Sequence, residues 1–406
     1  MCSESSPKRP RVYLHVGAPK TGTTFLQGVL WENRGSLEQQ NVWLPGAHPE
    51  DHFNAGFDLR GVEQDADDPR ERWAGAWDAM AAEIRGSGSG SDVVVVSDER
   101  LAACTIEEVA RSVASLAPAE VHVVYTTRGL AELFPAEWQE HVKDGGDTRT
   151  FDAWLRDVVA AKDEGGEWFW EVHDVTDVLR RWGSAVPAER LHVLTLPPPG
   201  SPPELLWERF TSVLGIDPGG VDTGVRANSS IGAEGAQVLR LVNEALPPDF
   251  PVWHRVLLAR DLLAHTILAT RETKTRITLP AEWAQWVREY TDQLVAELKS
   301  QDFHVVGDLN ELMPGDDVFE RTAELNPSDV LDTATDSIAR LLVHMSNERD
   351  LAREEARQEE AERIHREHRQ LAPVDRIKRT VVELGEQWKL VRTMLVVWRK
   401  MKSLRK

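Results

Sequence analysis

The sequence predicts an α/β protein in which helices cover both faces of a parallel sheet, with a helical extension at the C-terminus. Short runs of β-branched and aromatic residues alternate with segments of helical spacing, which is typical of parallel strands joined by crossover helices. One of these runs, Val93–Val96, is four consecutive valines, as expected for a strand buried on both faces. Beyond Gly232 the spacing is almost entirely helical.

The first expected strand is Arg11–Val16, and a loop at Gly17–Thr24 leads from it into a helix over Phe25–Leu37. After the valine strand, Thr105 and Glu108 have the spacing of a capping box, which predicts that a helix begins there. The remaining expected elements are strands at Val121–Tyr125 and Leu191–Leu196 and helices at Leu130–His141, Ala233–Ala245, Trp253–Ala269 and Ala281–Ser300.

The composition narrows the classes of function. The chain has 406 residues, 41% of them hydrophobic, enough for one large α/β domain or two domains. A net charge of −20 argues against binding nucleic acid through a basic surface. Two cysteines, Cys2 and Cys104, cannot build a disulfide framework or a four-cysteine zinc site, so we expect a reducing, cytoplasmic location. Neither a secretory signal nor an apolar stretch long enough to span a membrane is visible.

The strongest functional signal is the loop Gly17-Ala-Pro-Lys20-Thr21-Gly22-Thr23-Thr24. Between a strand and a helix, the N–H groups of such a loop converge on an anion, and the helix dipole adds to the attraction. Gly17 and Gly22 have the spacing of the nucleoside-triphosphate loop GxxxxGK[ST], but Thr23 stands where its lysine should be. The lysine is at Lys20 instead, so the loop suits one compact tetrahedral group better than β- and γ-phosphates.

The run Pro19-Lys20-Thr21-Gly22-Thr23-Thr24 resembles the 5′-phosphosulfate loop of sulfotransferases that use 3′-phosphoadenosine 5′-phosphosulfate (PAPS). A second segment, Val121–Arg128, is similar to the 3′-phosphate segment of that family and implies that Arg128 binds the 3′-phosphate. Arginine suits this role because its planar guanidinium binds phosphate oxygens in pairs. The family often has a serine eight residues later, where this chain has Ala136, so one expected donor to the 3′-phosphate is missing.

The segment Arg226-Ala-Asn228-Ser229-Ser230 is similar to one in bacterial members of the family whose polar side chains approach the nucleotide. This implies that Asn228 and Ser229 contact PAPS, although such residues before a helix also serve as N-caps. Gly307-Asp308-Leu309 resembles the end of the domain. The resemblance therefore implies a sulfotransferase domain with a P-loop NTPase-like fold at 11–315, after a disordered N-terminus at 1–10.

The family resemblance implies transfer of a sulfuryl group from PAPS to a hydroxyl or amine, leaving adenosine 3′,5′-bisphosphate, with no metal required. Lys20 would neutralise the leaving oxygen, and Thr21 to Thr24 would donate hydrogen bonds. The acceptor needs a general base, for which Glu99, at the end of the valine strand, is the first candidate and His52 the second. The acceptor could be a small molecule, a lipid or a glycan. The tryptophans around Trp168-Phe169-Trp170 either stack on the acceptor or pack in the core.

Two other interpretations stay open. The run Val93–Glu99 also mimics the strand and acidic pair that hold magnesium in ATPases, which sustains a P-loop ATPase or a small-molecule kinase as an alternative. The second alternative is a non-catalytic scaffold that acts through its helical tail. Failure to bind adenosine 3′,5′-bisphosphate would favour either of them over a sulfotransferase.

The C-terminal region divides into a linker with a charged helix at 316–372 and a basic amphipathic tail at 373–406. The tail has ten Lys or Arg against three Asp or Glu, a net charge of +7. Its apolar residues recur at helical spacing, so it could lie on an anionic membrane surface, dock on the acidic body of the same chain or form an oligomer contact. The apolar positions are Ile377, Val381, Leu384, Trp388, Val391, Leu395, Trp398 and Met401.

Overall fold

The structure is a computed structural model in which two units are distinguished, Met1–Ser337 and Ile338–Lys406. It describes residues 9–64, 73–86, 91–145, 147–225, 230–319 and 325–370, with positions 380, 382, 393, 396 and 398. The first unit extends past residue 315, because the 3₁₀ turn η7 (Asp316–Phe319) buries Val318 and Phe319, and the N–H of Leu279 donates to the carbonyl of Val318.

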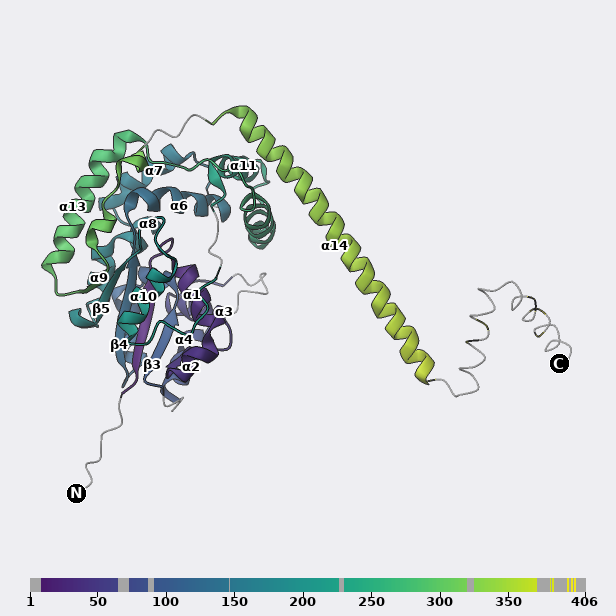
Figure 1. The fold of residues 1–406 in the computed structure, drawn as a ribbon, viewed down its shortest axis with the longest axis horizontal. Coiled ribbons are helices and arrows are strands. Elements are labelled where there is room, and N and C mark those ends of the chain that lie inside the picture. The colour runs from purple at the N-terminus through teal and green to yellow at the C-terminus, as the bar shows by residue number, and fades with distance from the viewer. Residues whose placement is uncertain are drawn as a thin grey trace, which may run out of the picture. The chain divides into compact units, whose positions relative to one another are not determined.

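The predicted parallel sheet is confirmed, and it has six strands in the order β2-β3-β1-β4-β5-β6 (Figure 1). β1 pairs with β3 on one side and β4 on the other, so the order of the chain reverses there. In open α/β sheets, ligands bind at the carboxyl ends of the strands beside such a reversal. The strands are β1 (Arg11–Gly17), β2 (Val42–Trp43), β3 (Val93–Ser97), β4 (Glu120–Thr127), β5 (Leu191–Thr195) and β6 (His304–Val306).

Helices cover both faces of the sheet, as the sequence predicts. Alternate residues of β1 point to opposite faces, with Val12 and Leu14 in one apolar cluster and Tyr13 in the other. The Tyr13 face is covered by α1 (Thr23–Glu32), α2 (Arg34–Gln39) and α10 (Glu204–Leu214). The Val12 face is covered by α3 (Pro49–Leu59), α4 (Ala76–Gly86), η1 (Glu99–Ala103), α5 (Ile106–Ser115), α8 (Trp168–His173), α9 (Val175–Trp182), α13 (Ala284–Ser300) and η6 (Leu309–Leu312).

A third group of helices lies beyond the carboxyl ends of the strands, where Figure 1 shows α6, α7 and α11. The long helix predicted at Leu130–His141 is present, and it packs against α11. These elements are α6 (Leu130–Lys143), α7 (Phe151–Ala160), α11 (Gly232–Ala245), α12 (Val252–Arg255) and the π-helical segment η4 (Val256–Leu268). Short 3₁₀ turns are η2 (Ala161–Asp163), η3 (Ala188–Arg190) and η5 (Ala281–Trp283).

Several features differ from the expected pattern. The single helix expected at Phe25–Leu37 is two helices, because the side-chain amide of Asn33 donates to the carbonyls of Val29 and Asp222 where α1 ends. The edge strands β2 and β6 were not expected, since two or three residues are too short to show a period. Helix α3, which contains His52, was not expected either.

The C-terminal helix α14 spans Pro327–Gln370. Among its apolar side chains, Ile338, Leu342 and Met345 are exposed. Most of the basic tail, including Ile377, Trp388 and Met401, lies outside the described residues, so its amphipathic helix stays a prediction. None of the helices within the described ranges is both long and apolar enough to cross a bilayer.

Candidate functional site

A cavity of about 320 Å³ lies where four neighbouring strands end at their carboxyl side. The loop after β1 supplies Lys20, the residues after β3 supply Glu99, and β4 and β5 are followed by Arg128 and Leu196. The fold therefore brings together the phosphate loop, the arginine expected to bind the 3′-phosphate and the first candidate base. The cavity is lined by Pro19, Lys20, Gly22, Thr23, Thr24, Phe25, Glu99, Arg128, Ala136, Gln139, Lys143, Leu196 and Ser230.

The loop between β1 and α1 has the geometry of an anion cradle. Lys20 and Gly22 both have positive φ angles, 57° and 90°. No side chain among the described residues caps the start of α1, so the N–H groups of its first turn are available to a ligand. The hydroxyl of Thr21 is fully buried and contacts the carbonyl of Ala18 and the hydroxyl of Thr126, both at 2.5 Å. The Thr21 side chain thus holds the loop against β4, and Thr21 is not among the residues that line the cavity.

Gly22 provides a test of the loop geometry. A Cβ at this position would lie 2.4 Å from Cδ2 of Leu206, in a backbone conformation that L-residues rarely adopt. We expect Gly22→Ala to lower the free energy of unfolding by about 1–3 kcal/mol, measured by urea denaturation. The matched control is Gly35→Ala in α2, where a Cβ meets nothing within 4 Å. That control should raise the stability by up to about 1 kcal/mol, and equal effects of the two would contradict the strained loop.

Arg128 follows β4 directly and faces the cavity. Burial lowers the pKa of its guanidinium, against the opposing effect of the Glu132 carboxylate. It makes no hydrogen bond or ion pair with any residue in the described part of the chain, and a half-buried cation without a close partner is costly. This is the environment expected of an arginine that awaits an anionic ligand. Asn228 and Ser229 lie outside the described residues, but the next residue, Ser230, lines the same cavity.

Glu99 lines the cavity beside the loop. Its Oε2 accepts a hydrogen bond of 2.8 Å from the side-chain amide of Gln27 on α1, which orients the carboxylate. Gly17 permits this close approach: a Cβ there would lie 2.7 Å from Cβ of Glu99 and 2.8 Å from its Cα. The glycine that begins the loop thus also sets the position of the candidate base.

His52 does not line this cavity. Its ring is 1% exposed and packs against Trp31, with Nε2 3.0 Å from the carbonyl of Pro45 and Nδ1 accepting from the N–H of Ser97. Burial lowers the pKa of His52 to about 4. The structure thus places the second candidate base inside the fold, where both ring nitrogens already have partners.

Helix α6 supplies residues that no sequence motif indicates. Lys143 and Gln139 line the cavity on the same helical face as Ala136. Glu140, on that face too, pairs with Lys20 at 2.7 Å and with Lys143 at 3.2 Å. Helical spacing from Ala136 could have indicated this face. The pairing with Lys20, which is 120 positions earlier in the chain, has no local signal.

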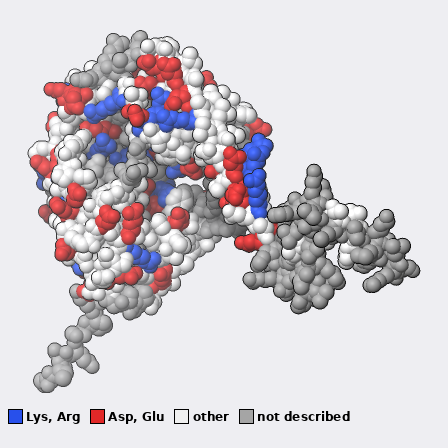
Figure 2. Space-filling view, turned by 45° about the vertical axis from the view of Figure 1, so that its right-hand side comes forward, with Lys and Arg blue, Asp and Glu red and all other residues white. Residues whose placement is uncertain are grey.

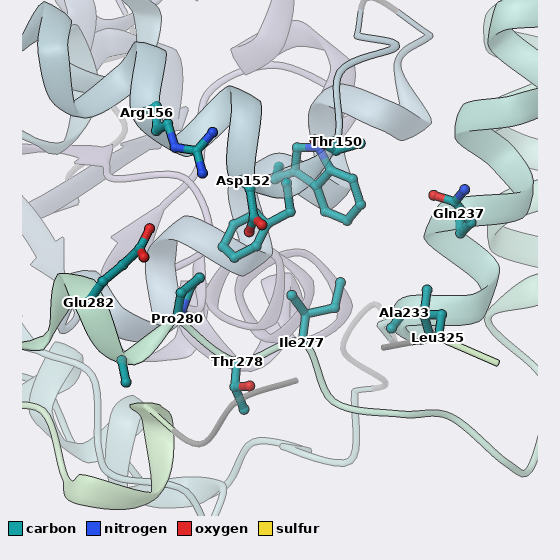
Figure 3. A pocket seen from close by; sticks show the side chains of 13 residues that line it. Thr150, Asp152, Arg156, Ala233, Gln237, Ile277, Thr278, Pro280, Glu282 and Leu325 are labelled. Atoms are coloured by element: carbon teal, nitrogen blue, oxygen red, sulfur yellow. The ribbon is translucent and has the colours of Figure 1, made fainter. Parts of the chain in front are cut away.

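A second cavity of about 700 Å³ contains none of the predicted site residues. It is lined by α7, the first turns of α11 and the segment after Ile277 (Figure 3). Figure 3 shows Asp152, Arg156 and Glu282 on one side of the hollow and Gln237 opposite them. Trp138 and Phe151 add aromatic surface.

The tryptophan-rich segment packs in the core. Phe169 and Trp170 are buried, and the Phe169 ring stacks on Phe134 with centroids 4.7 Å apart. The indole N–H of Trp170 donates to the carbonyl of Val158. These rings therefore stabilise the fold rather than offering a surface for an acceptor to stack on.

Charge is distributed unevenly between surface and site. Figure 2 shows acidic side chains spread over one face of the molecule, with Lys and Arg in smaller groups. The cavity at the strand ends instead gathers three cationic side chains, Lys20, Arg128 and Lys143. A cationic cavity in a chain of net charge −20 favours a compact anion over an extended polyanion.

No protein-family model matches the sequence, and no curated protein matches it. Among solved structures, the chain is similar to the crystal structure of a sulfotransferase from Alicyclobacillus acidocaldarius. The match has 16% sequence identity and a TM-score of 0.38, and it covers 55% of this chain and 87% of the other. At this level the similarity is one of fold alone.

Proposed function

We propose that this protein is a sulfotransferase that moves a sulfuryl group from PAPS to a hydroxyl or amine acceptor. The observation that supports it most is the meeting of Lys20, Arg128 and Glu99 around one cavity at the ends of β1, β4 and β3. These are the residues expected to neutralise the leaving group, hold the 3′-phosphate and accept a proton. They converge although they come from three distant segments.

In the proposed reaction the 5′-phosphosulfate lies in the loop, with its oxygens on the N–H groups at the start of α1. The acceptor oxygen or nitrogen attacks sulfur in line with the bridging oxygen, forming one bond to sulfur while the bond from sulfur to the bridging oxygen breaks. Glu99 takes the proton of the acceptor, and Lys20 neutralises the negative charge that develops on the departing phosphate oxygen. Arg128 holds the 3′-phosphate, away from the reacting sulfur.

The alternative of a magnesium-dependent ATPase or kinase requires the acidic pair after β3, Asp98 and Glu99, to be available to the metal and its water. Only Glu99 lines the cavity, because Asp98 is 1% exposed and both of its carboxylate oxygens bind the guanidinium of Arg100, at 2.9 and 2.5 Å. Thr23 occupies the lysine position of the triphosphate loop. Both observations disfavour this alternative.

Ligand-induced thermal stabilisation tests the donor. Adenosine 3′,5′-bisphosphate should raise the Tm, because a ligand at 100 times its Kd stabilises the folded state by about 2.7 kcal/mol. ATP with magnesium should raise the Tm much less, since Lys20 does not stand where a triphosphate needs it. A larger shift with ATP and magnesium would contradict the proposal.

The acceptor is to be identified by transfer of label from PAPS to a panel of hydroxyl and amine compounds, including glycans, lipids and small metabolites.

A further inference from the structure

Glu140 lies between two lysines that line the proposed donor cavity. Its Oε2 is 2.7 Å from Nζ of Lys20 and 3.2 Å from Nζ of Lys143. Lys20 comes from the loop after β1, whereas Lys143 is one helical turn after Glu140 on α6. One carboxylate oxygen therefore holds both ammonium groups at the wall of the cavity.

The three charged groups are largely removed from solvent. The side chains of Lys20, Glu140 and Lys143 are 25%, 18% and 6% exposed. Burial by itself would raise the pKa of Glu140, but the two lysines outweigh it and lower this pKa to about 2. Burial lowers the pKa of Lys143, and Glu140 opposes that change. Each lysine in the empty cavity is thus compensated by the same ionised carboxylate.

We propose that Lys143 is a third cationic ligand of the donor anion and that Glu140 is an internal counter-ion, which the anion displaces from the two lysines. This inference rests on the proposed function, because it concerns the same cavity. Glu140 is a positioning residue: it contacts the lysines, and it is not among the residues that line the cavity.

The physical argument is one of competition for the same ammonium groups. Lys143 is nearly buried, and removing the partner of a buried charge is strongly destabilising. Glu140 therefore stabilises the empty protein. An anion whose oxygens reach both lysines provides the same compensation, and Glu140 then opposes its binding through repulsion between like charges. A variant without this carboxylate should bind anions more tightly and be less stable when empty.

Isothermal titration at mildly acidic pH tests the competition. The probes are adenosine 3′,5′-bisphosphate and, separately, inorganic sulfate. Glu140→Gln should tighten binding of both by about tenfold or more and lower the Tm of the empty protein. Glu244→Gln is the matched control: Glu244 on α11 pairs with Arg240 at 3.3 Å, and neither residue lines the cavity. It should change both affinities by less than about threefold.

Lys143 is tested by two replacements. Lys143→Met should weaken binding of both probes by about tenfold or more, because a charged hydrogen-bond donor is lost. Lys143→Arg keeps the charge and should retain most of the affinity, which separates loss of the charge from misfolding. Circular dichroism of each variant shows whether it is folded.

The outcomes distinguish this inference from the proposed function. Unchanged or weaker anion binding by Glu140→Gln would overturn the counter-ion role, and unchanged binding by Lys143→Met would overturn the ligand role. If sulfate shows the expected pattern while adenosine 3′,5′-bisphosphate binds to none of the proteins, the inference holds and the proposed donor is wrong. Failure of every form to bind either probe would overturn both.

Discussion

Replacing Glu99 by glutamine is expected to lower the turnover number of the proposed reaction by about 10²- to 10⁴-fold, the usual contribution of a general base. The amide keeps the shape of the carboxylate and can still contact Gln27, but it cannot accept the proton of the acceptor. Binding of adenosine 3′,5′-bisphosphate should change little, since Arg128 and the loop carry the expected phosphate contacts. Turnover of labelled PAPS and titration of the nucleotide measure the two effects separately.

Two further variants sharpen this test. Gln27→Leu keeps the Glu99 side chain but removes the group that orients it, so we expect a smaller loss of turnover than in Glu99→Gln. His52→Gln is the control for the other candidate base. If Glu99→Gln kept near-normal activity while His52→Gln lost it, the assignment would be reversed, despite the burial of His52.

Lys20→Ala is expected to lower the turnover number by about 10²- to 10³-fold, the usual effect of removing a group that stabilises developing negative charge. Its effect on nucleotide binding should be smaller, because the charge it meets grows in the transition state. The change does not leave Glu140 without a cation, since Lys143 is 3.2 Å away. The folded state should therefore survive the substitution.

Arg128→Ala is expected to have the opposite balance of effects from Lys20→Ala. It should mainly weaken binding of adenosine 3′,5′-bisphosphate, because the 3′-phosphate is remote from the reacting sulfur in the proposed arrangement. The Tm of the empty variant is measured as well, because the change also removes the cation that opposes the effect of burial on the pKa of Glu132. Calorimetric titration and turnover are measured for both variants. Equal weakening of nucleotide binding by the two changes would refute the division of roles.

Much of the fold was predictable from local pattern. The four valines of β3 are at most 2% exposed, as their sequence indicated, and the capping box of Thr105 and Glu108 begins α5 where expected. These features depend on residues that are close together in the chain, so the local spacing of residue types predicts them. The missed strands β2 and β6 obtain their pairing from β3 and β5 instead.

What the sequence by itself determined is the loop from Gly17 to Thr24 and the positions of Arg128 and Glu99 just after strands, because each depends on a motif of a few residues. Only the tertiary structure decided which side chains meet there. One face of α6 packs toward the loop, so that Glu140 pairs with Lys20. His52 is buried, and its Nδ1 accepts a hydrogen bond from the N–H of Ser97. The orientation of a helix is set by its packing against distant segments, so no local spacing could decide these contacts.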